Sequence, residues 1–194
     1  MGDSNPTPQS NSNRPPPSLP PHYTLVPGTP PVPSYLHLRL ASGLSPKTPS
    51  QAAAISTGTW HGVYITHTPP NPTPPVPQSQ AAAIPVAMGR IVGDGAWCFQ
   101  IVDVAVLPEY QRRGLGGVII RELLRYIMEN KAEGTPYVNL LADEAGRELY
   151  RKYGFVETVE KGSAGMVWEG WRGYNAEHNR NGGSEVEASL GETR

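Results

Sequence analysis

The middle of the chain begins with two apolar stretches separated by a turn. Residues 86–92 and 97–107 are mostly apolar, and Gly93-Asp94-Gly95 between them is typical of a hairpin. The apolar run at 97–107 is almost continuous, which predicts a strand buried on both faces of a sheet. We therefore expect residues 97–107 to form the central strand.

The next segment changes to a helical period. Residues 116–130 place an apolar stripe on one face, and charged residues occupy the other positions: the stripe is Ile119, Ile120, Leu123, Leu124, Ile127 and Met128. A short apolar strand at 137–141 follows, and then a helix with Asp143 at its N-cap and Gly154 at its end. The order strand, helix, strand, helix predicts a parallel pair of strands with a right-handed crossover.

The flanking parts have shorter patterns. Strands are expected at 23–26 and 60–66, and two antiparallel strands at 155–158 and 165–171 are expected to close the sheet. Residues 33–40 predict a helix, and a second helix is expected to start at 47–54. The spacing of Leu36, Leu40 and Leu44 predicts that these three leucines share one buried face.

Composition sets the expected domain limits. Of the 194 residues, 22 are proline, and they are dense in residues 1–21 and 67–85. We expect a disordered tail at 1–21, one folded domain at 22–174 with a surface loop inserted at 67–85, and a polar disordered tail at 175–194. Residues 14–20 read Arg-Pro-Pro-Pro-Ser-Leu-Pro, a pattern that SH3-type grooves accept, although chance matches are frequent in such a tail.

Charge and cysteine content limit the classes of binding partner and site that we expect. A net charge of -1 gives no case for binding nucleic acid or an anionic membrane. The single Cys98 excludes an intramolecular disulfide, and the five histidines show no metal-ligand spacing. Without a signal peptide or a bilayer-spanning apolar run, a soluble and cytoplasmic monomer or homodimer is expected, with the nucleus as an open alternative.

The segment 103–117 carries the clearest chemical signal. It leads from a buried strand through Gln111-Arg112-Arg113-Gly114 into the start of a helix. Glycines allow close backbone approach, and free N–H groups with the helix dipole favour an anion, which predicts a phosphate-bearing ligand. A Rossmann site is disfavoured because Ile119 occupies the third glycine position, and no Gly-x-x-x-x-Gly-Lys loop is present.

Two segments together resemble the signature of the GNAT family of acetyl-CoA-dependent N-acetyltransferases: residues 104–116 and the Leu-Tyr-Arg-Lys-Tyr-Gly-Phe run at 149–155. The resemblance implies an α/β (α+β) fold whose mixed sheet has about six or seven strands, splays at the central parallel pair and is flanked by about four helices. It implies acetyl-CoA as cosubstrate. The cofactor-binding residues that it implies are Val104, Ala105, Val106, Gln111, Arg112, Arg113, Gly114, Leu115, Gly116, Gly117, Asp143 and Tyr150.

The resemblance also implies direct attack of a neutral amine on the thioester. Tyr150 matches the family tyrosine that protonates the departing thiolate, or else it only packs on the cofactor sulfur. No general base is evident, because Cys98, Gln100 and Val102 occupy the corresponding strand face. Asp103 is a candidate base acting through water, with a structural hydrogen-bonding role as the alternative. Asp143 and Gly146 stand where many relatives have Asn and Ala, and helix capping explains Asp143 equally well.

The acceptor is less well defined. Five aromatic residues on elements that flank the family's substrate cleft are candidate pocket residues: Tyr35, Trp60, Tyr64, Trp97 and Trp168. They favour a small apolar or aryl amine. The alternatives are a peptide or protein N-terminus or lysine as acceptor, or a non-catalytic acetyl-CoA-binding or scaffold module.

Overall fold

The computed structural model describes residues 19–70 and 83–166. The chain divides into two units, Met1–Phe155 and Val156–Arg194, and each is described by itself. The described part of the second unit, residues 156–166, contains one short 3-10 helix, η3 (Thr158–Lys161). The rest of this section concerns the first unit.

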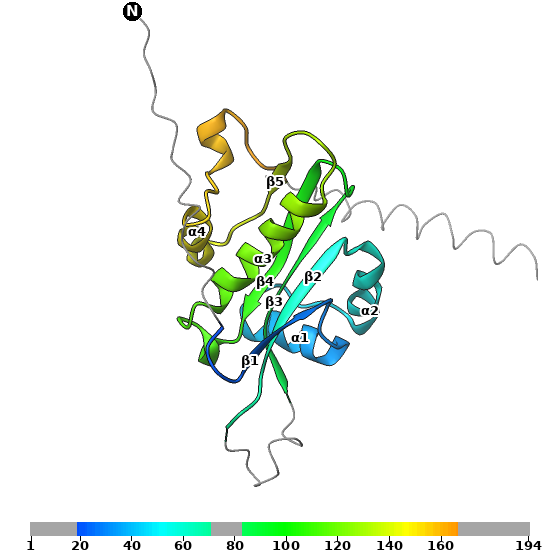
Figure 1. Cartoon of the computed structure of the whole chain (residues 1–194), viewed down its shortest axis with the longest axis vertical. Helices are drawn as coiled ribbons and strands as arrows, with labels where there is room; N and C mark the ends of the chain where they lie inside the picture. The colour runs from blue at the N-terminus through cyan, green and yellow to red at the C-terminus, as the bar shows by residue number, and fades with distance from the viewer. Residues whose placement is uncertain (1–18, 71–82, 167–194) are drawn as a thin grey trace, which may run out of the picture. The chain divides into compact units, whose positions relative to one another are not determined.

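The first unit is built on a five-stranded sheet of order β1-β2-β3-β4-β5 (Figure 1). Neighbours from β1 to β4 pair antiparallel, and β4 pairs with β5 in parallel. The strands are β1 (Tyr23–Pro27), β2 (His61–His67), β3 (Ile84–Gly93), β4 (Cys98–Val106) and β5 (Tyr137–Asn139). The predicted parallel crossover is therefore confirmed, with a helix between β4 and β5.

Four α-helices accompany the sheet: α1 (Val32–Ala41), α2 (Pro49–Gly58), α3 (Leu115–Asn130) and α4 (Glu144–Arg151). Helices α3 and α1 lie on opposite faces. A side chain at Gly89 would meet Ile119 of α3, whereas the next residue, Arg90, reaches Asp103 together with Arg39 of α1. Successive strand residues point to opposite faces, which makes a three-layer arrangement of helix, sheet and helix.

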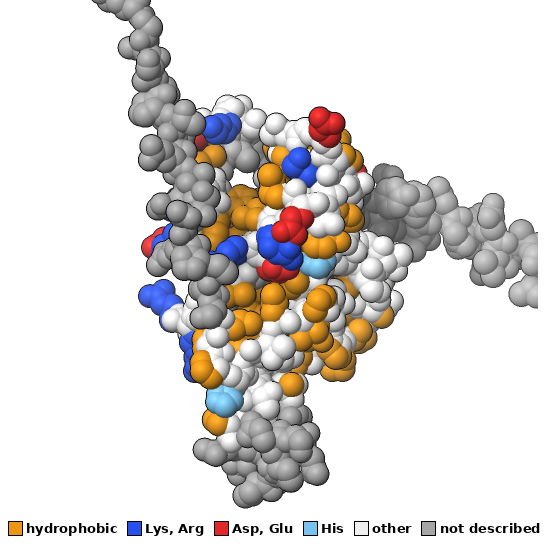
Figure 2. All heavy atoms as spheres, in the orientation of Figure 1, with side chains coloured by type: hydrophobic (Ala, Val, Ile, Leu, Met, Phe, Trp, Pro, Cys, Tyr) orange, Lys and Arg blue, Asp and Glu red, His pale blue; other side chains and the backbone are white. Residues whose placement is uncertain are grey.

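Helix α3 supplies most of the helical core. Its buried residues are Leu115, Gly117, Ile119, Ile120, Leu123 and Ile127. Burying a side chain of this size stabilises the fold by about 1.5–3 kcal/mol. Charged side chains of both signs gather over the outer face of α3, where Arg125 pairs with Glu122 and Glu129 (Figure 2). The predicted stripe is right except at its end, because Met128 is 61% exposed.

The predicted face of α1 is wrong. Tyr35, Leu38 and Arg39 are buried, while Leu40 is 67% exposed. The reason is tertiary: Arg39 finds a carboxylate partner on the sheet, so the helix turns its Tyr35–Arg39 side inward. The start of α2 is as expected, with Thr48 and Gln51 forming a reciprocal capping box.

Two expectations about the sheet also need correction. In the sheet it is β3 that lies in the middle. Strand β4 is not buried on both faces, because only Phe99, Ile101 and Ala105 are fully buried and its other residues are half-buried. The proline-rich loop is shorter than predicted, because Ile84 and Pro85 pair with His67 and Thr66. Pro85 is accommodated because it lies near a strand end beside a register shift, where a missing N–H is tolerated.

The strand predicted at 155–158 is wrong. Gly154 takes a left-handed φ of 87°, and the backbone N–H of Phe155 then donates to the Tyr150 carbonyl. Residues 156 and 157 have no regular structure, and Thr158 begins η3. Residues 165 and 166 have no regular structure, and the rest of the strand predicted at 165–171 lies outside the described residues. The described residues thus form a sheet of five strands, where about six or seven were expected for the chain.

Several expectations fall on residues that the structure does not describe: 1–18, 71–82 and 167–194. They include most of the proline-rich motif at 14–20, most of the loop and the domain end at 174. Leu19, at the first described position, packs against the core. Within 19–70 and 83–166, no helix has the length and hydropathy that a bilayer crossing requires.

Candidate active site

The site begins at an edge of β4 that lacks a strand partner. Strand β5 pairs with β4 only from Cys98 to Gln100, whereas β4 continues to Val106. In the described part of the sheet, residues 101–106 are therefore paired only on the side of β3. Such an edge leaves backbone groups available to an extended ligand chain. The predicted residues Val104, Ala105 and Val106 all lie on it.

A bulge interrupts β4 on this edge. Met88 pairs with Ala105 and Arg90 with Val102, so two residues of β4 stand opposite Gly89 alone. The first of the two, Asp103, has a left-handed φ of 56°. A bulge of this kind bends the strand and redirects its backbone. The bend comes just beyond the end of the pairing with β5.

The turn after β4 presents a series of free backbone donors. A 3-10 helix, η2 (Pro108–Tyr110), leads to Arg112 with φ 61° and Gly114 with φ 81°, and α3 follows. Among the described residues no backbone acceptor is found for the N–H groups from 112 to 117; the next, that of Val118, bonds Gly114. Consecutive free N–H groups at a helix N-terminus attract a phosphate.

Two side chains fix this turn. Gln111 Nε2 donates to the Val106 carbonyl at 3.1 Å, which ties the turn to the end of β4. Arg113 donates to Tyr23 Oη and to the Glu109 carbonyl, both at 2.8 Å, and lies over the Tyr110 ring. Both residues were predicted to bind cofactor. In the structure they also shape the turn, so the backbone donors are held in place.

Helix α4 packs against the same turn through two glycines. A Cβ at Gly116 would lie 3.1 Å from Leu149 Cδ2 and 3.7 Å from Val106 Cγ2. A Cβ at Gly117 would come closer than 3.0 Å to Tyr153 Oη. The glycines thus permit α4, the start of α3 and the end of β4 to meet. The two sequence segments 104–116 and 149–155 come together here.

Tyr150 of α4 occupies a half-buried position beside Gly146. A Cβ on Gly146 would lie 3.0 Å from Tyr150 Cε2, so the glycine makes room for the ring. Burial, and then the nearby Asp143 carboxylate, raise the pKa of Tyr150 above its usual range. The phenol therefore keeps its proton at neutral pH. Asp143 is at the N-cap as expected, but its side chain makes no capping hydrogen bond.

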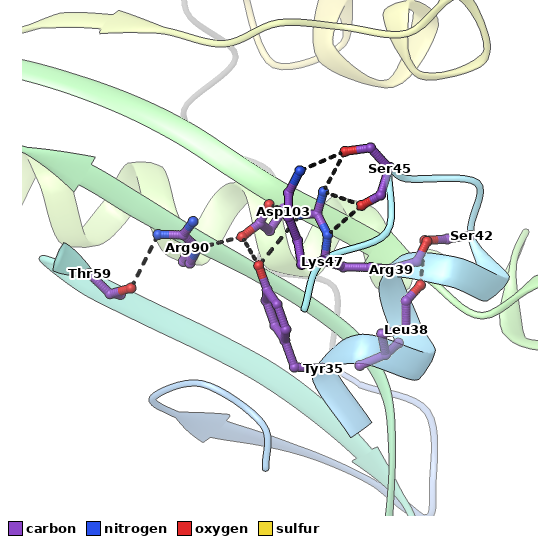
Figure 3. A network of polar contacts seen from close by, with 9 residues as sticks. All are labelled: Tyr35, Leu38, Arg39, Ser42, Ser45, Lys47, Thr59, Arg90 and Asp103. Carbon is purple, nitrogen blue, oxygen red and sulfur yellow. Dashed lines mark hydrogen bonds and ion pairs between the residues drawn. The ribbon is translucent and has the colours of Figure 1, made fainter. Parts of the chain in front are cut away.

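Asp103 lies in a polar cluster on the α1 face (Figure 3). Tyr35 Oη donates to its carboxylate at 2.7 Å, and Arg39 and Arg90 both form ion pairs with it. Burial alone would raise the pKa of Asp103, but the hydrogen bond from Tyr35 and the two guanidinium groups outweigh it and lower the pKa. A carboxylate so held is a poor proton acceptor, which favours the structural role considered for Asp103.

Sequence reasoning missed both arginines. The sequence feature that could have identified them is a charged residue within an apolar segment. Arg39 lies among the apolar residues of 33–40, and Arg90 lies in the apolar run 86–92. Charged residues are rarely buried unless they are paired. A search for a buried partner would therefore have linked these positions to Asp103.

The four candidate acceptor residues that the structure describes do not line one common pocket. Tyr35 is buried and lines a small depression with Thr29, Pro30, Met88, Gly89, Arg90 and Asp103. Tyr64 pairs in register with Met88, whereas Trp60 packs against Phe99 and Tyr126 of α3. Trp97 is 59% exposed before β4, and Trp168 lies outside the described residues.

Comparison with known proteins gives a consistent result. Residues 81–157 match the family model described as "Acetyltransferase (GNAT) domain". Over 83 residues, 43% of this chain, the sequence is 36% identical to "Histone acetyltransferase TAP1" of Glycine max and 34% identical to "GCN5-related N-acetyltransferase 2, chloroplastic" of Arabidopsis thaliana. The aligned segment spans 34% and 31% of those two relatives. Because one of them is named chloroplastic, the cytoplasmic location stays a prediction.

A solved structure extends the similarity to the whole fold. A protein from meticillin-resistant Staphylococcus aureus, titled a probable acetyltransferase, superposes with a TM-score of 0.62 at 32% identity. The match covers 76% of this chain and 98% of that one. The chain belongs to the GNAT acetyltransferase family.

Proposed function

We propose that this protein is an N-acetyltransferase that moves an acetyl group from acetyl-CoA to a primary amine. The observation that carries the proposal is the meeting of the free N–H groups of residues 112–117 with the unpaired edge of β4. The turn suits a pyrophosphate, and the edge suits the amides of a pantetheine arm. A family member with both features has what binding of acetyl-CoA requires.

In the proposed reaction the amine attacks the thioester carbonyl directly. The oxyanion that forms accepts a hydrogen bond from a backbone N–H of β4, which is a preorganised donor. The carbonyl re-forms as the C–S bond breaks, and the coenzyme A thiolate takes the phenolic proton of Tyr150. The proton lost from the amide nitrogen passes to solvent, from which the Tyr150 phenolate regains one. The raised pKa keeps Tyr150 protonated until the thiolate forms, and it also makes the phenol a weaker acid. No covalent enzyme intermediate is involved.

Substitution of Tyr150 by Phe tests the acid role. The ring and its edge contact with Phe155 are retained, and only the acidic proton is lost. We expect kcat to fall about 10²-fold or more, as is typical when a general acid is removed, with a much smaller change in the KM for acetyl-CoA.

Tyr153→Phe is the matched control, because it removes a hydroxyl one turn later that faces Gly117. It should leave kcat nearly unchanged. An unaltered kcat in Tyr150→Phe at saturating substrates would show that the tyrosine only packs against the cofactor.

For the acceptor we propose a small apolar amine. The support is the small depression on the side of the sheet opposite α3, where Tyr35, Met88 and Pro30 lie beside the paired charges of Arg90 and Asp103. The second candidate is a protein lysine or N-terminus, favoured by the likeness to a relative named as a histone acetyltransferase. The compartment in which the protein works would decide which acceptors it meets.

One assay separates these candidates. Thiol release from acetyl-CoA is measured with a panel of alkyl and aryl amines and with lysine and N-terminal peptides. Small-amine activity at least tenfold above peptide activity supports the proposal, and the reverse supports a protein substrate. Tight binding of acetyl-CoA with no amine-dependent thiol would indicate a non-catalytic module.

A further inference from the structure

The Asp103 carboxylate joins parts of the chain that are distant in sequence. Its two oxygens accept from Tyr35 and Arg39 of α1 and from Arg90 of β3. Figure 3 shows the three donors converging on it from two sides. Arg39 Nε and Nη2 donate to the Ser45 carbonyl at 3.0 and 2.9 Å, Nη2 also donates to Ser45 Oγ at 3.2 Å, and Nη1 donates to Tyr35 Oη at 3.5 Å.

The cluster is also tied to the end of α2. Arg90 Nη1 donates to Thr59 Oγ1 at 3.3 Å, and Thr59 in turn donates to the Ile55 carbonyl at 2.7 Å. The Asp103 and Arg39 side chains are 10% and 7% exposed. One carboxylate thus links both helices of this face to two strands.

Stability alone is a weak reason for such a cluster. Two positive charges and one negative charge are removed from water, and buried ion pairs often contribute no more than apolar packing would. The position of Asp103 is more informative. It is the left-handed residue of the β4 bulge, directly before the Val104–Val106 edge. A non-glycine residue keeps this sparsely populated conformation only where its surroundings hold it.

We propose that Asp103 is a positioning residue for acetyl transfer. Tyr35, Arg39 and Arg90 clamp its carboxylate, and the clamp fixes the bulge so that the backbone N–H groups after it point at the thioester. The inference rests on the proposed function. It assigns Arg39 and Arg90 a role in catalysis that acts through the backbone of β4. Arg39 does not line the depression proposed for the acceptor, so an effect at Arg39 is separate from acceptor binding.

Three substitutions at position 103 separate the clamp from the backbone angle. Gly adopts a φ of 56° freely but cannot be clamped, Asn tolerates that φ and keeps one acceptor oxygen, and Ala does neither. If only the angle mattered, Gly would restore activity. We expect Asp103→Gly to lower kcat tenfold or more, almost as far as Ala, with Asn between them and wild type.

The binding measurements supply the discriminating readout. Because the phosphate-binding turn at 112–117 keeps its own contacts, the Kd of coenzyme A should change less than threefold in Asp103→Gly. Glu129→Gln is the control, since it removes one carboxylate from an exposed ion pair on α3 and should leave kcat and Kd unchanged. Tyr35→Phe keeps the ring and loses one donor, so kcat should fall severalfold even if the position 103 variants fold poorly.

Hydrogen exchange keeps this test separate from the proposed function. Acetyl-CoA should protect the amides of residues 104–106 in wild type and protect them clearly less in Asp103→Gly or Tyr35→Phe. Absence of acetyl transfer in wild type would refute the proposed function while leaving the exchange result to decide the clamp. Wild-type kcat and wild-type protection in Asp103→Gly would overturn the clamp.

Discussion

The contact between Gly117 and Tyr153 allows a sharp test of how α4 is held. A Cβ placed on Gly117 would come within 3.0 Å of Tyr153 Oη, while the next atom of that ring, Cζ, would lie at an ordinary 3.4 Å. The conflict in Gly117→Ala therefore involves one oxygen atom. Since α4 also carries Tyr150, relief of the clash by moving α4 would disturb the active site.

The expected magnitude follows from two opposing effects. Overpacking of a well-filled contact costs about 1–3 kcal/mol. Replacing glycine by alanine in a helix gains up to about 1 kcal/mol. Gly117→Ala should thus be destabilised by about 1 kcal/mol, a Tm loss of roughly 2–4 °C for a domain of this size. The KM for acetyl-CoA should rise, because residue 117 belongs to the turn proposed to bind the pyrophosphate.

A double-mutant cycle with Tyr153→Phe isolates the clash. Within the described residues no hydrogen bond of Tyr153 Oη is found, so Tyr153→Phe alone should change stability by less than about 0.5 kcal/mol. The double variant removes the clashing oxygen and should be at least as stable as wild type, a coupling of about 1–2 kcal/mol in urea unfolding. Equal destabilisation of Gly117→Ala with and without the Tyr153 hydroxyl would refute this account of the packing.

Two further predictions concern the rest of the fold. His61 Nε2 and His67 Nδ1 are buried without a hydrogen-bond partner in the described part of the chain, and burial lowers the pKa of both imidazoles. In the unfolded chain these histidines have a pKa of about 6.5 and bind protons more readily, so the stability of the folded state should fall as the pH drops below that value. The Tm should therefore be lower at pH 5.5 than at pH 7.5, with a smaller loss in His61→Phe, and a Tm that is flat over this range would contradict the prediction. Leu123→Ala should cost about 2–5 kcal/mol in urea unfolding because Leu123 is fully buried, while Met128→Ala, at an exposed position of the same helix, should stay within about 0.5 kcal/mol; similar losses in both would contradict the burial pattern.

The parts of the fold that could be predicted are those that local sequence determines. Helix α3 was predicted from its apolar period almost to the residue, and the turn after β3 from Gly93-Asp94-Gly95. In that turn Asp94 Oδ1 accepts from three successive backbone N–H groups, those of Ala96, Trp97 and Cys98. These contacts lie within a few residues of one another, so the information that specifies them is contiguous.

The features that could not be predicted depend on contacts between distant residues. Which face of α1 is buried depends on Arg39 meeting a carboxylate 64 positions later. The end of the β5 pairing at Gln100 and the bulge at Asp103 depend on the register of three strands. The hydrophobic period of a strand or helix does not specify how one strand pairs with the next. The pattern therefore identified β4 but did not show where its edge loses its strand partner.

This difference has a consequence for the active site. The turn proposed to bind phosphate is encoded by neighbouring residues, so that role could be proposed from Gln111 to Gly117 alone. The orientation of the β4 backbone N–H groups depends on Tyr35, Arg39 and Arg90, which lie outside both motif segments. A change at these three residues should therefore spare cofactor affinity and alter turnover. If substitution of Arg39 or Arg90 lowers kcat and leaves the Kd of the cofactor unchanged, the geometry of the site depends on contacts between distant residues as well as on the motif.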